Sequence, residues 1–338
     1  MPGSLQSLQE SIYVKMLMEI TANMTSKIIL NPYAGRWKGL QKRGEIEDSM
    51  KSLNLDFDLV MTEAPNHGTE LAYQAVNNGF SPIIAAGGDG SFSEVMNGIV
   101  LAAQESHTAP PPMGLLPLGT ANDLMVNLGL PTDILGASKV ISAGHTRRID
   151  LGEVIAWDIY GKSSKKRFFD NNSAIGLEPH VTLIQQRISW LRGSLRYLVA
   201  TLMGVLKNPQ WKMHLEWDGG DYNGPATLVT VGNNPLTGGV FYMAPHADPF
   251  DGILDCVYGY IPSRINILRV LPKTMKSDAG NYVEHPSINE IKVSWLKIHT
   301  DHPTPLHADG EIQYEATQDM EYHILPGYLP ILMYEAEK

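Results

Sequence analysis

The stretch Ala85–Ile99, AAGGDGSFSEVMNGI, decides the fold. It begins at the end of an apolar run and continues with the spacing of a helix. Glycines between a strand and a helix let the backbone approach a phosphate closely, and the helix N-terminus adds a partial positive charge. Gly87, Gly88 and Gly90 meet this requirement, although a turn built only for folding would use the same glycines. Asp89 favours the phosphate loop, because a carboxylate beside phosphate needs a cation between them, commonly Mg²⁺.

The start of this helix also carries a capping pattern. Ser91 is followed three residues later by Glu94, and this spacing predicts a capping box. The stretch is neither a Walker A loop nor a dinucleotide fingerprint, because G-x-x-x-x-G-K-[ST] and G-x-G-x-x-G are both absent from the chain.

Apolar runs alternate with helical patterns through the first part of the chain. SKIILNP, LDFDLVM, SPIIAAGG and MGLLPLG are predicted strands, and residues 40–53 and 69–78 have helical spacing. This alternation predicts a parallel sheet with helices on both faces. Ligands bind at the carboxyl edge of such sheets, so the loops that begin at Asn31, Gly87 and Pro117 are expected to lie side by side.

Beyond about Arg148 the apolar runs are shorter and turn residues separate them. Runs such as DLGEVIAW, WKMHLEWDG and EIKVSWLKIHT predict an antiparallel sheet, which two helical patterns at 179–206 and 263–275 interrupt. The last segment, MEYHILPGYLPILMYE, either completes this sheet or returns to the first domain. The expected division is an N-terminal extension over 1–24, an α/β domain over 25–147, a β-rich domain over 148–321, and a closing segment over 322–338.

Composition excludes several classes of protein. The net charge of −10 argues against a nucleic-acid binder, which normally has a basic surplus. The single cysteine, Cys256, cannot form an internal disulfide or a C-x-x-C zinc site, and it favours a reducing, cytoplasmic location. No run reaches the roughly 18 apolar residues of a membrane span, and the first residues lack the features of a secretory signal.

Two further glycine loops agree with the first. LNPYAGRWKG follows the first predicted strand with Asn31 and Gly35, and LPLGTANDLMVNLGLP follows the fourth with Asn122 and Asp123. Late in the chain, HADGE places Asp309 before a glycine. A short acid in such a turn can point into a cleft, although a simple hairpin uses the same residues.

These motifs, in this order, resemble the diacylglycerol kinase catalytic domain family. The resemblance rests on NPYAG, GGDGSFSEVMNGI, PLGTANDL, VGNNPLTGGVFYMAPHADPFDGILD and HADGE, and it covers Lys27 to Tyr334. GGDG alone is shared with NAD kinases and phosphofructokinases, whereas PLGT-x-ND and the late DGE are not. The resemblance implies a Rossmann-like ATP-binding domain with a parallel sheet and a C-terminal antiparallel β-sandwich that binds the substrate. It implies an ATP- and Mg²⁺-dependent lipid kinase, with diacylglycerol as the first candidate acceptor and phosphatidic acid as its product.

The resemblance also implies roles for individual residues. Asp309 is the implied general base, and Asp89 and Glu311 complete the implied catalytic set. The implied nucleotide-binding residues are Asn31, Pro32, Tyr33, Ala34, Gly35, Thr62, Gly88, Asp89, Gly90, Ser91, Glu94, Thr120, Asn122 and Asp123.

Two magnesium sites are implied as well. Asp89, Asp123 and Asp150 match family aspartates linked to Mg²⁺ around the nucleotide. A structural Mg²⁺ site matches the carboxylate of Asp251 and the backbone carbonyls of Asp248 and Ile253.

The sequence departs from the family pattern in three places. Ala34 replaces the usual serine, Ser91 the usual threonine, and Ser93 an asparagine. Losing the hydroxyl at Ala34 and the amide at Ser93 would weaken ATP contacts by about 1 kcal/mol each. A non-catalytic nucleotide-binding homologue therefore stays open, as does a kinase of a sphingoid base, another lipid or a soluble acceptor.

The stretch Trp190–Leu202 carries apolar residues with Arg187, Arg192 and Arg196 among or beside them. This pattern suits a helix on an anionic membrane, or a helix packed on its own sheet. The basic run GKSSKKR (161–167) is either a solvated turn or a lipid headgroup contact. The expected partner is a lipid substrate at a membrane surface, contacted transiently, with a homodimer left open and no nucleic acid.

Overall fold

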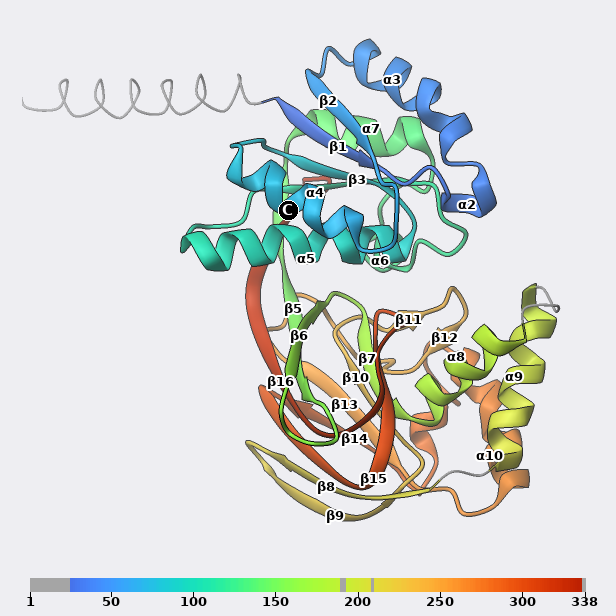
Figure 1. Cartoon of the computed structure of the whole chain (residues 1–338). Coiled ribbons are helices and arrows are strands. Elements are labelled where there is room, and N and C mark those ends of the chain that lie inside the picture. The colour runs from blue at the N-terminus through green and yellow to red at the C-terminus, as the bar shows by residue number, and fades with distance from the viewer. Residues whose placement is uncertain (1–24, 189–192, 208–209, 336–338) are drawn as a thin grey trace, which may run out of the picture.

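The computed structural model describes residues 25–188, 193–207 and 210–335. The predicted N-terminal extension, 1–24, lies outside the described residues. The rest of the chain forms an α/β part, at the top of Figure 1, and a β-rich part below it. No helix of the described ranges is long and apolar enough to cross a membrane.

The α/β part has a parallel sheet with strand order β2–β1–β3–β4. Helices α3 and α7 pack on one face and α4 and α5 on the other (Figure 1). The strands are β1 (Ser26–Leu30), β2 (Phe57–Met61), β3 (Ile83–Gly87) and β4 (Met113–Pro117). The helices are α2 (Ala34–Trp37), η1 (Leu40–Lys42), α3 (Arg43–Ser52), α4 (His67–Asn77), α5 (Asp89–Ser106), α6 (Asp123–Asn127) and α7 (Ile134–Ala143).

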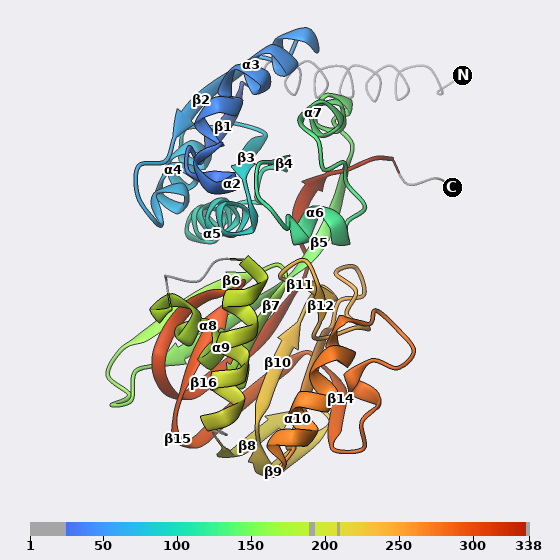
Figure 2. The ribbon, with the colours of Figure 1, turned by 90° about the vertical axis from the view of Figure 1, so that its right-hand side faces the viewer.

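The β-rich part consists of antiparallel strands with helices along one side (Figure 2). Its strands are β5 (Thr146–Trp157), β6 (Ser164–Phe169), β7 (Asn172–Gly176), β8 (Trp211–Trp217), β9 (Gly220–Ala226), β10 (Leu228–Gly232), β11 (Leu236–Thr237), β12 (Phe241–Tyr242), β13 (Leu254–Gly259), β14 (Ile288–Val293), β15 (Trp295–Ala308) and β16 (Glu311–Leu332). Its helices are α8 (Leu177–Arg187), α9 (Gly193–Lys207), α10 (Arg264–Val270), η2 (Leu271–Met275) and η3 (Tyr282–Glu284).

Together these parts confirm the predicted fold class, a parallel α/β domain followed by an antiparallel β-sandwich. The helical pattern at 179–206 is divided between α8 and α9, and the pattern at 263–275 forms α10 and η2. Strand β9 had no counterpart among the predicted runs, because GDYNGPA contains two glycines and a proline.

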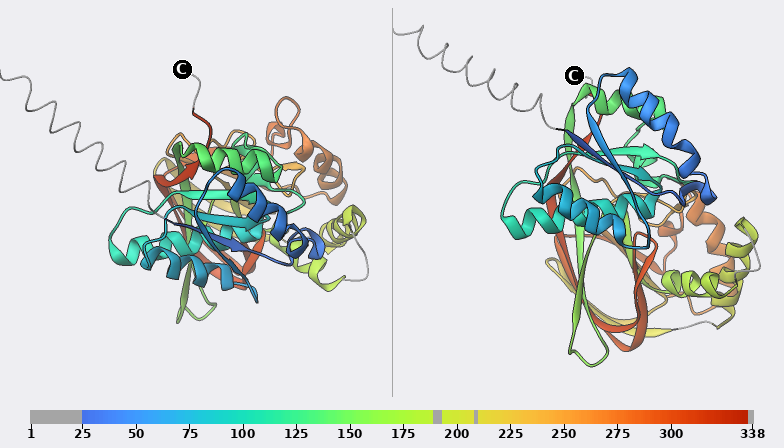
Figure 3. Two further views of the ribbon diagram at one scale, coloured as in Figure 1. Left: turned by 90° about the horizontal axis from the view of Figure 1, so that it is seen from above. Right: turned by 45° about the horizontal axis from the view of Figure 1, so that its top comes forward.

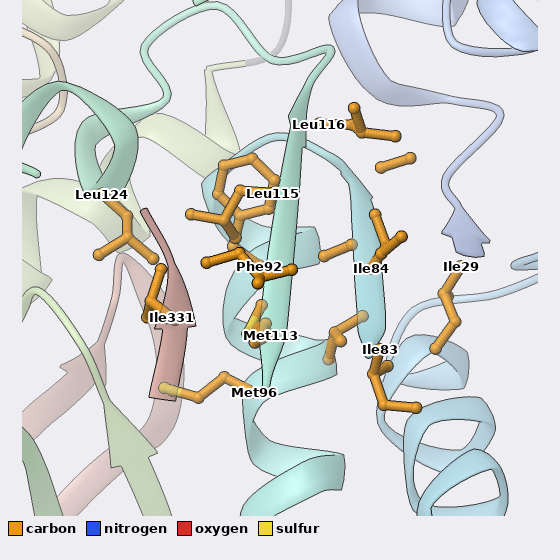
Figure 4. Close-up of a cluster of buried hydrophobic side chains, with 14 of the residues drawn as sticks. Ile29, Ile83, Ile84, Phe92, Met96, Met113, Leu115, Leu116, Leu124 and Ile331 are labelled. Carbon is orange, nitrogen blue, oxygen red and sulfur yellow. The ribbon is translucent and has the colours of Figure 1, made fainter. Parts of the chain in front are cut away.

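Two strands run from one part to the other, as Figure 3 shows in its tilted view. β5 and β16 pair antiparallel, from Ala156 and Met320 to Thr146 and Leu332. Near its end β16 turns parallel to β4, and Ile331 packs into the core of the α/β part (Figure 4). The last segment therefore completes one sheet and joins the other. We propose 25–147, closed by 322–338, and 148–321 as the two domains.

Candidate active site

The three glycine loops pack directly on one another at the carboxyl edge of the parallel sheet. A Cβ atom added to Gly88 would lie 2.9 Å from Gly119 Cα, and one added to Gly35 would lie 2.5 Å from the Leu118 carbonyl oxygen. Gly35 also has a positive φ of 59°. These glycines are therefore required for the loops to approach one another, whatever else they bind.

The first loop is joined to the second through Asn31. Its amide donates to Ser91 Oγ at 2.9 Å, and its side-chain oxygen accepts from the Tyr33 backbone at 2.9 Å. Ala34 is buried beside it, so a serine hydroxyl here would also lie away from water. Thr62 directly follows β2, and its backbone N–H donates to the Leu30 carbonyl at 2.9 Å.

The capping box predicted for Ser91 and Glu94 is wrong. Helix α5 begins at Asp89, with Gly88 at the N-cap position and no side-chain cap. The Glu94 carboxylate instead accepts from the backbone N–H groups of Asn66 and Gly68, at 2.8 and 2.9 Å. Because those groups begin α4, Glu94 satisfies the free donors of the neighbouring helix rather than those of its own.

Asp89 has one oxygen engaged and one free. Its Oδ2 accepts from the Asn122 backbone at 3.0 Å, while Oδ1 is buried without a partner. Burial raises the pKa of this carboxyl, and the surrounding backbone donors offset part of the rise. An unpaired buried carboxylate oxygen beside a glycine loop fits Mg²⁺, which takes one or two carboxylates and completes its shell with phosphates and water.

Asp123 contacts the other part of the molecule rather than the glycine loop. Its two oxygens accept from the backbone N–H groups of Gly238 and Gly239, the latter at 2.7 Å. Burial, and then the charge of Asp89, raise its pKa to about 6. Thr120 lies exposed in the same loop. Asp123 thus joins the two domains in this structure.

Asp309 lies in the turn between β15 and β16. Its φ is +47°, a left-handed conformation that aspartate tolerates better than most residues. Its carboxylate accepts from the Asn171 backbone at 3.1 Å and from Ser93 Oγ at 2.9 Å. Its own N–H donates to the Asn172 carbonyl at 2.8 Å. Burial raises the pKa of Asp309, and these donors partly offset the rise.

Several residues of this site were not among the predicted ones. Asp170 is buried, and burial together with the charge of Asp309 raises its pKa well above the usual range. Arg167 donates to Ser93 Oγ at 3.1 Å and contacts Glu311 Oε2 at 3.4 Å. The sequence signal was the polar run DNN inside an apolar strand pattern, and a basic hairpin that ends in arginine.

A cavity of about 590 Å³ opens beside the Asp309 turn. Gly310 and Glu311 line it from the turn, Leu183 and Gln186 from α8, and Glu94 from α5. The lining mixes apolar and polar side chains, so the cavity can receive a molecule with both kinds of surface.

The predicted structural metal site contains an ion pair. Lys292 Nζ lies 2.9 Å from Asp251 Oδ2 and 3.1 Å from Asp255 Oδ2. The ammonium already neutralises the carboxylate that Mg²⁺ would bind, so these residues do not require a metal. In the described part of the chain, no three His, Cys, Asp or Glu side chains are arranged to hold a metal ion. The role predicted for Asp251, Asp248 and Ile253 stays a prediction.

Asp150 lies where β5 and β16 cross between the domains. Its two oxygens accept from the backbone N–H groups of Gly252 and Gly327, both at 2.6 Å. Gly327 falls within the irregularity of the β5–β16 pairing between Leu325 and Leu329. The carboxylate therefore satisfies the Gly327 N–H, which the interrupted ladder leaves free, and ties the Gly252 turn to β5.

Known proteins resemble this chain in sequence and in fold. It is 26% identical over 287 residues to a diacylglycerol kinase from Staphylococcus carnosus (strain TM300), which covers 85% of this chain and 88% of that protein. It is 29% identical over 293 residues to a diacylglycerol kinase from Staphylococcus aureus (strain JH9), covering 85% of each. A crystal structure of a diacylglycerol kinase from Bacillus anthracis (strain Sterne) superimposes with a TM-score of 0.68 over 92% of this chain and 97% of that chain. At 20% identity, the last likeness shows the fold alone.

Two family models match the chain one after the other. The diacylglycerol kinase catalytic domain matches residues 25–154, and the YegS C-terminal NAD kinase beta sandwich-like domain matches residues 172–333. The protein is therefore a kinase that belongs to the diacylglycerol kinase catalytic domain family.

Proposed function

We propose that this kinase transfers the γ-phosphate of ATP to a lipid hydroxyl, with diacylglycerol as the first candidate and Asp309 as the general base. The observation that carries the proposal is the contact between Asp309 and Ser93, which joins the acid of the β15–β16 turn to the helix of the glycine loop. A base and a phosphate loop in one network are what phosphoryl transfer to a hydroxyl requires.

The proposed reaction needs little covalent help from the protein. The acceptor hydroxyl gives its proton to Asp309, its oxygen forms a bond to the γ-phosphorus, and the bond to the ADP oxygen breaks. Backbone N–H groups at the start of α5 and the loop residues Asn31, Gly88 and Gly90 hold the phosphates. Asp89 would hold Mg²⁺ through Oδ1, and the bound ion would neutralise phosphate charge.

The cavity beside Asp309 is the proposed acceptor site. Leu183 and Tyr314 offer apolar surface to a lipid body, and Gln186 and Glu311 offer polar groups to its head. The polar lining also favours a second candidate, a kinase of a soluble acceptor. Phosphate transfer from labelled ATP to diacylglycerol, a sphingoid base and a polyprenol in mixed micelles, and to NAD in solution, separates the two, with EDTA as the metal control.

We also propose where the enzyme touches the membrane. Trp190 and Leu191 lie outside the described residues. The hypothesis that Trp190–Leu202 forms a membrane-binding helix therefore rests on the sequence alone. The segment 264–276 carries four basic residues and no acid, in a chain with a net charge of −10. Ile265, Leu268 and Met275 expose 63%, 37% and 55% of their surface there. Exposed apolar side chains among basic ones match an anionic lipid surface.

A further inference from the structure

The basic run GKSSKKR changes character at its last residue. Strand β6 is exposed from Ser164 through Lys166 and buried from Arg167 onward. Only 9% of the Arg167 surface is exposed. A single solvated basic turn therefore does not describe this run, because its arginine points into the protein while its lysines remain in water.

Helix α5 fixes the position of this arginine. The Asn97 side chain accepts from the Phe168 backbone N–H and donates to the Phe168 carbonyl, both at 3.0 Å. These two bonds tie β6 to the helix that begins at the glycine loop. Arg167, one residue earlier, is therefore held at a fixed place beside that helix.

The guanidinium is only partly used by the protein. Its Nη2 donates to Ser93 Oγ and contacts Glu311, whereas its Nε–H is buried without a partner. Buried N–H groups in native proteins are nearly always paired with the protein, an ordered water or a ligand, so the Nε–H of Arg167 is a donor that the described side chains leave unused. Arginine offers its donors in a planar fork that matches two oxygens of a phosphoryl group.

Ser93 links the arginine to the proposed base. Its hydroxyl donates to Asp309 Oδ2 and accepts from Arg167, so the guanidinium lies one hydroxyl away from Asp309. A counter-ion for the acids around it is the simpler role. That role accounts for Nη2 and leaves the buried Nε–H unexplained.

We propose that Arg167 binds an oxygen of the γ-phosphoryl group of the nucleotide and keeps that contact during transfer. This inference rests on the proposed kinase reaction and adds a residue to it. With nucleotide bound, Arg167 would approach the transferred group from the side of Asp309, to which Ser93 links it. Ser93 then holds the base and the arginine at a fixed separation.

The test compares ATP with ADP, because only ATP carries the γ-phosphoryl group. Each nucleotide, with Mg²⁺, is titrated by calorimetry into the wild type, Arg167→Met, Arg167→Lys and Lys166→Met. Lys166→Met is the matched control, since it removes the same charge one residue away. The Lys166 ammonium pairs with Glu153 at 2.8 Å and lies 5.8 Å from the centre of the Phe168 ring. In Arg167→Met the ATP affinity should fall about tenfold or more, while the ADP affinity stays within about threefold.

Phosphate transfer by the same variant should fall about 10²-fold or more, as when one transition-state donor is removed. The transfer rate of Arg167→Lys should lie between those of the wild type and Arg167→Met. Lys166→Met should transfer phosphate at the wild-type rate. Equal losses of ATP and ADP affinity, or no loss of either, would overturn the proposal. If Arg167→Met does not fold, Arg167→Lys decides by the same ratio of the two affinities. If the wild type phosphorylates no lipid while Arg167→Met still loses affinity for ATP alone, the lipid kinase proposal is refuted and the Arg167 site stands.

Discussion

Ser93 Oγ donates a 2.9 Å hydrogen bond to Asp309 Oδ2 across 216 positions of the sequence. Ser93 belongs to the helix that follows the glycine loop, and Asp309 to a turn of the β-rich domain. One contact thus joins the proposed phosphate site to the proposed base. The sequence resemblance leads one to expect asparagine at this position, and in this structure Ser93 contacts the acid through its hydroxyl.

Replacing Asp309 with asparagine should separate binding from transfer. In the proposed mechanism the glycine-loop amides and Mg²⁺ hold the phosphates, so the ATP affinity should stay within a few-fold. Loss of a general base should lower transfer to the lipid about 10²–10⁴-fold. Calorimetry gives the first quantity, and transfer of labelled γ-phosphate gives the second. Transfer near the wild-type rate would make Asp309 a turn residue, and loss of ATP binding would make its role structural or metal-linked.

Replacing Asp89 with asparagine should affect the metal more than the fold. An asparagine oxygen can still accept from the Asn122 backbone, so the unfolding temperature should change little. The orphaned carboxylate oxygen loses its charge, so turnover should nearly vanish and the Mg²⁺ concentration for half-maximal activity should rise. Asp48→Asn, at an exposed acid on α3, is the control. Unchanged turnover and Mg²⁺ dependence would remove Asp89 from the metal site.

The sequence predicted the site as far as local pattern and sheet geometry allow. Strands in alternation with helices place Asn31, Gly88 and Thr120 at one edge, and the three loops do meet there. It did not predict Arg167, because nothing in GKSSKKR shows which residue turns inward. That depends on the pairing of β6 with β5 and on the contact of Phe168 with Asn97.

The capping box failed for a related reason. Local spacing pairs Ser91 with Glu94, but the Glu94 carboxylate accepts its hydrogen bonds from the backbone of another helix. The free N–H groups at the start of α4 lie 2.8 and 2.9 Å from Glu94, across the side of α5 that faces α4. A cap pattern in sequence competes with every unsatisfied donor that tertiary packing brings near, and the sequence alone does not show those donors.

Stability should respond to pH through Asp123. Its pKa is about 6 in the folded protein and 3.8 ordinarily, so the folded state binds more protons between these values. This carboxyl therefore favours folding as the pH falls through that window and costs stability above it. In urea unfolding, the unfolding free energy of the wild type relative to that of Asp123→Asn should be larger at pH 5 than at pH 7. Equal changes in both proteins, or a relative loss by the wild type, would contradict the prediction.

The ion pairs of Lys292 predict a metal response in a variant. Lys292→Met leaves Asp251 and the buried Asp255 without their ammonium, which should cost about 1–3 kcal/mol of unfolding free energy. Millimolar Mg²⁺ should restore part of this loss. The unfolding free energy of the wild type should be the same with EDTA as without it. Urea unfolding with and without Mg²⁺ measures both, with Lys212→Met on β8 as the control. A wild type that loses as much in EDTA as the variant does would show that a metal stabilises this site already.

The surface of segment 264–276 predicts which lipids the enzyme binds. The segment is basic and attracts anionic lipid, whereas the net charge of the chain is negative. Vesicles that contain phosphatidylglycerol should therefore bind the protein, and neutral phosphatidylcholine vesicles should not. Replacing Ile265 and Leu268 with serine should reduce sedimentation with anionic vesicles about fivefold or more, because both side chains lose apolar contact with the bilayer.

Val126 and Leu135 expose 46% and 50% of their surface on the α/β domain, and their double serine variant is the matched control. It should bind vesicles as the wild type does. An equal loss of vesicle binding in the two double variants would mean that exposed apolar side chains promote binding wherever they lie on the protein. If the Ile265 and Leu268 variant binds vesicles as well as the wild type does, segment 264–276 is not the membrane contact. Because Leu268 is still largely packed, with 37% of its surface exposed, the unfolding temperature of the double variant is measured beside its vesicle binding.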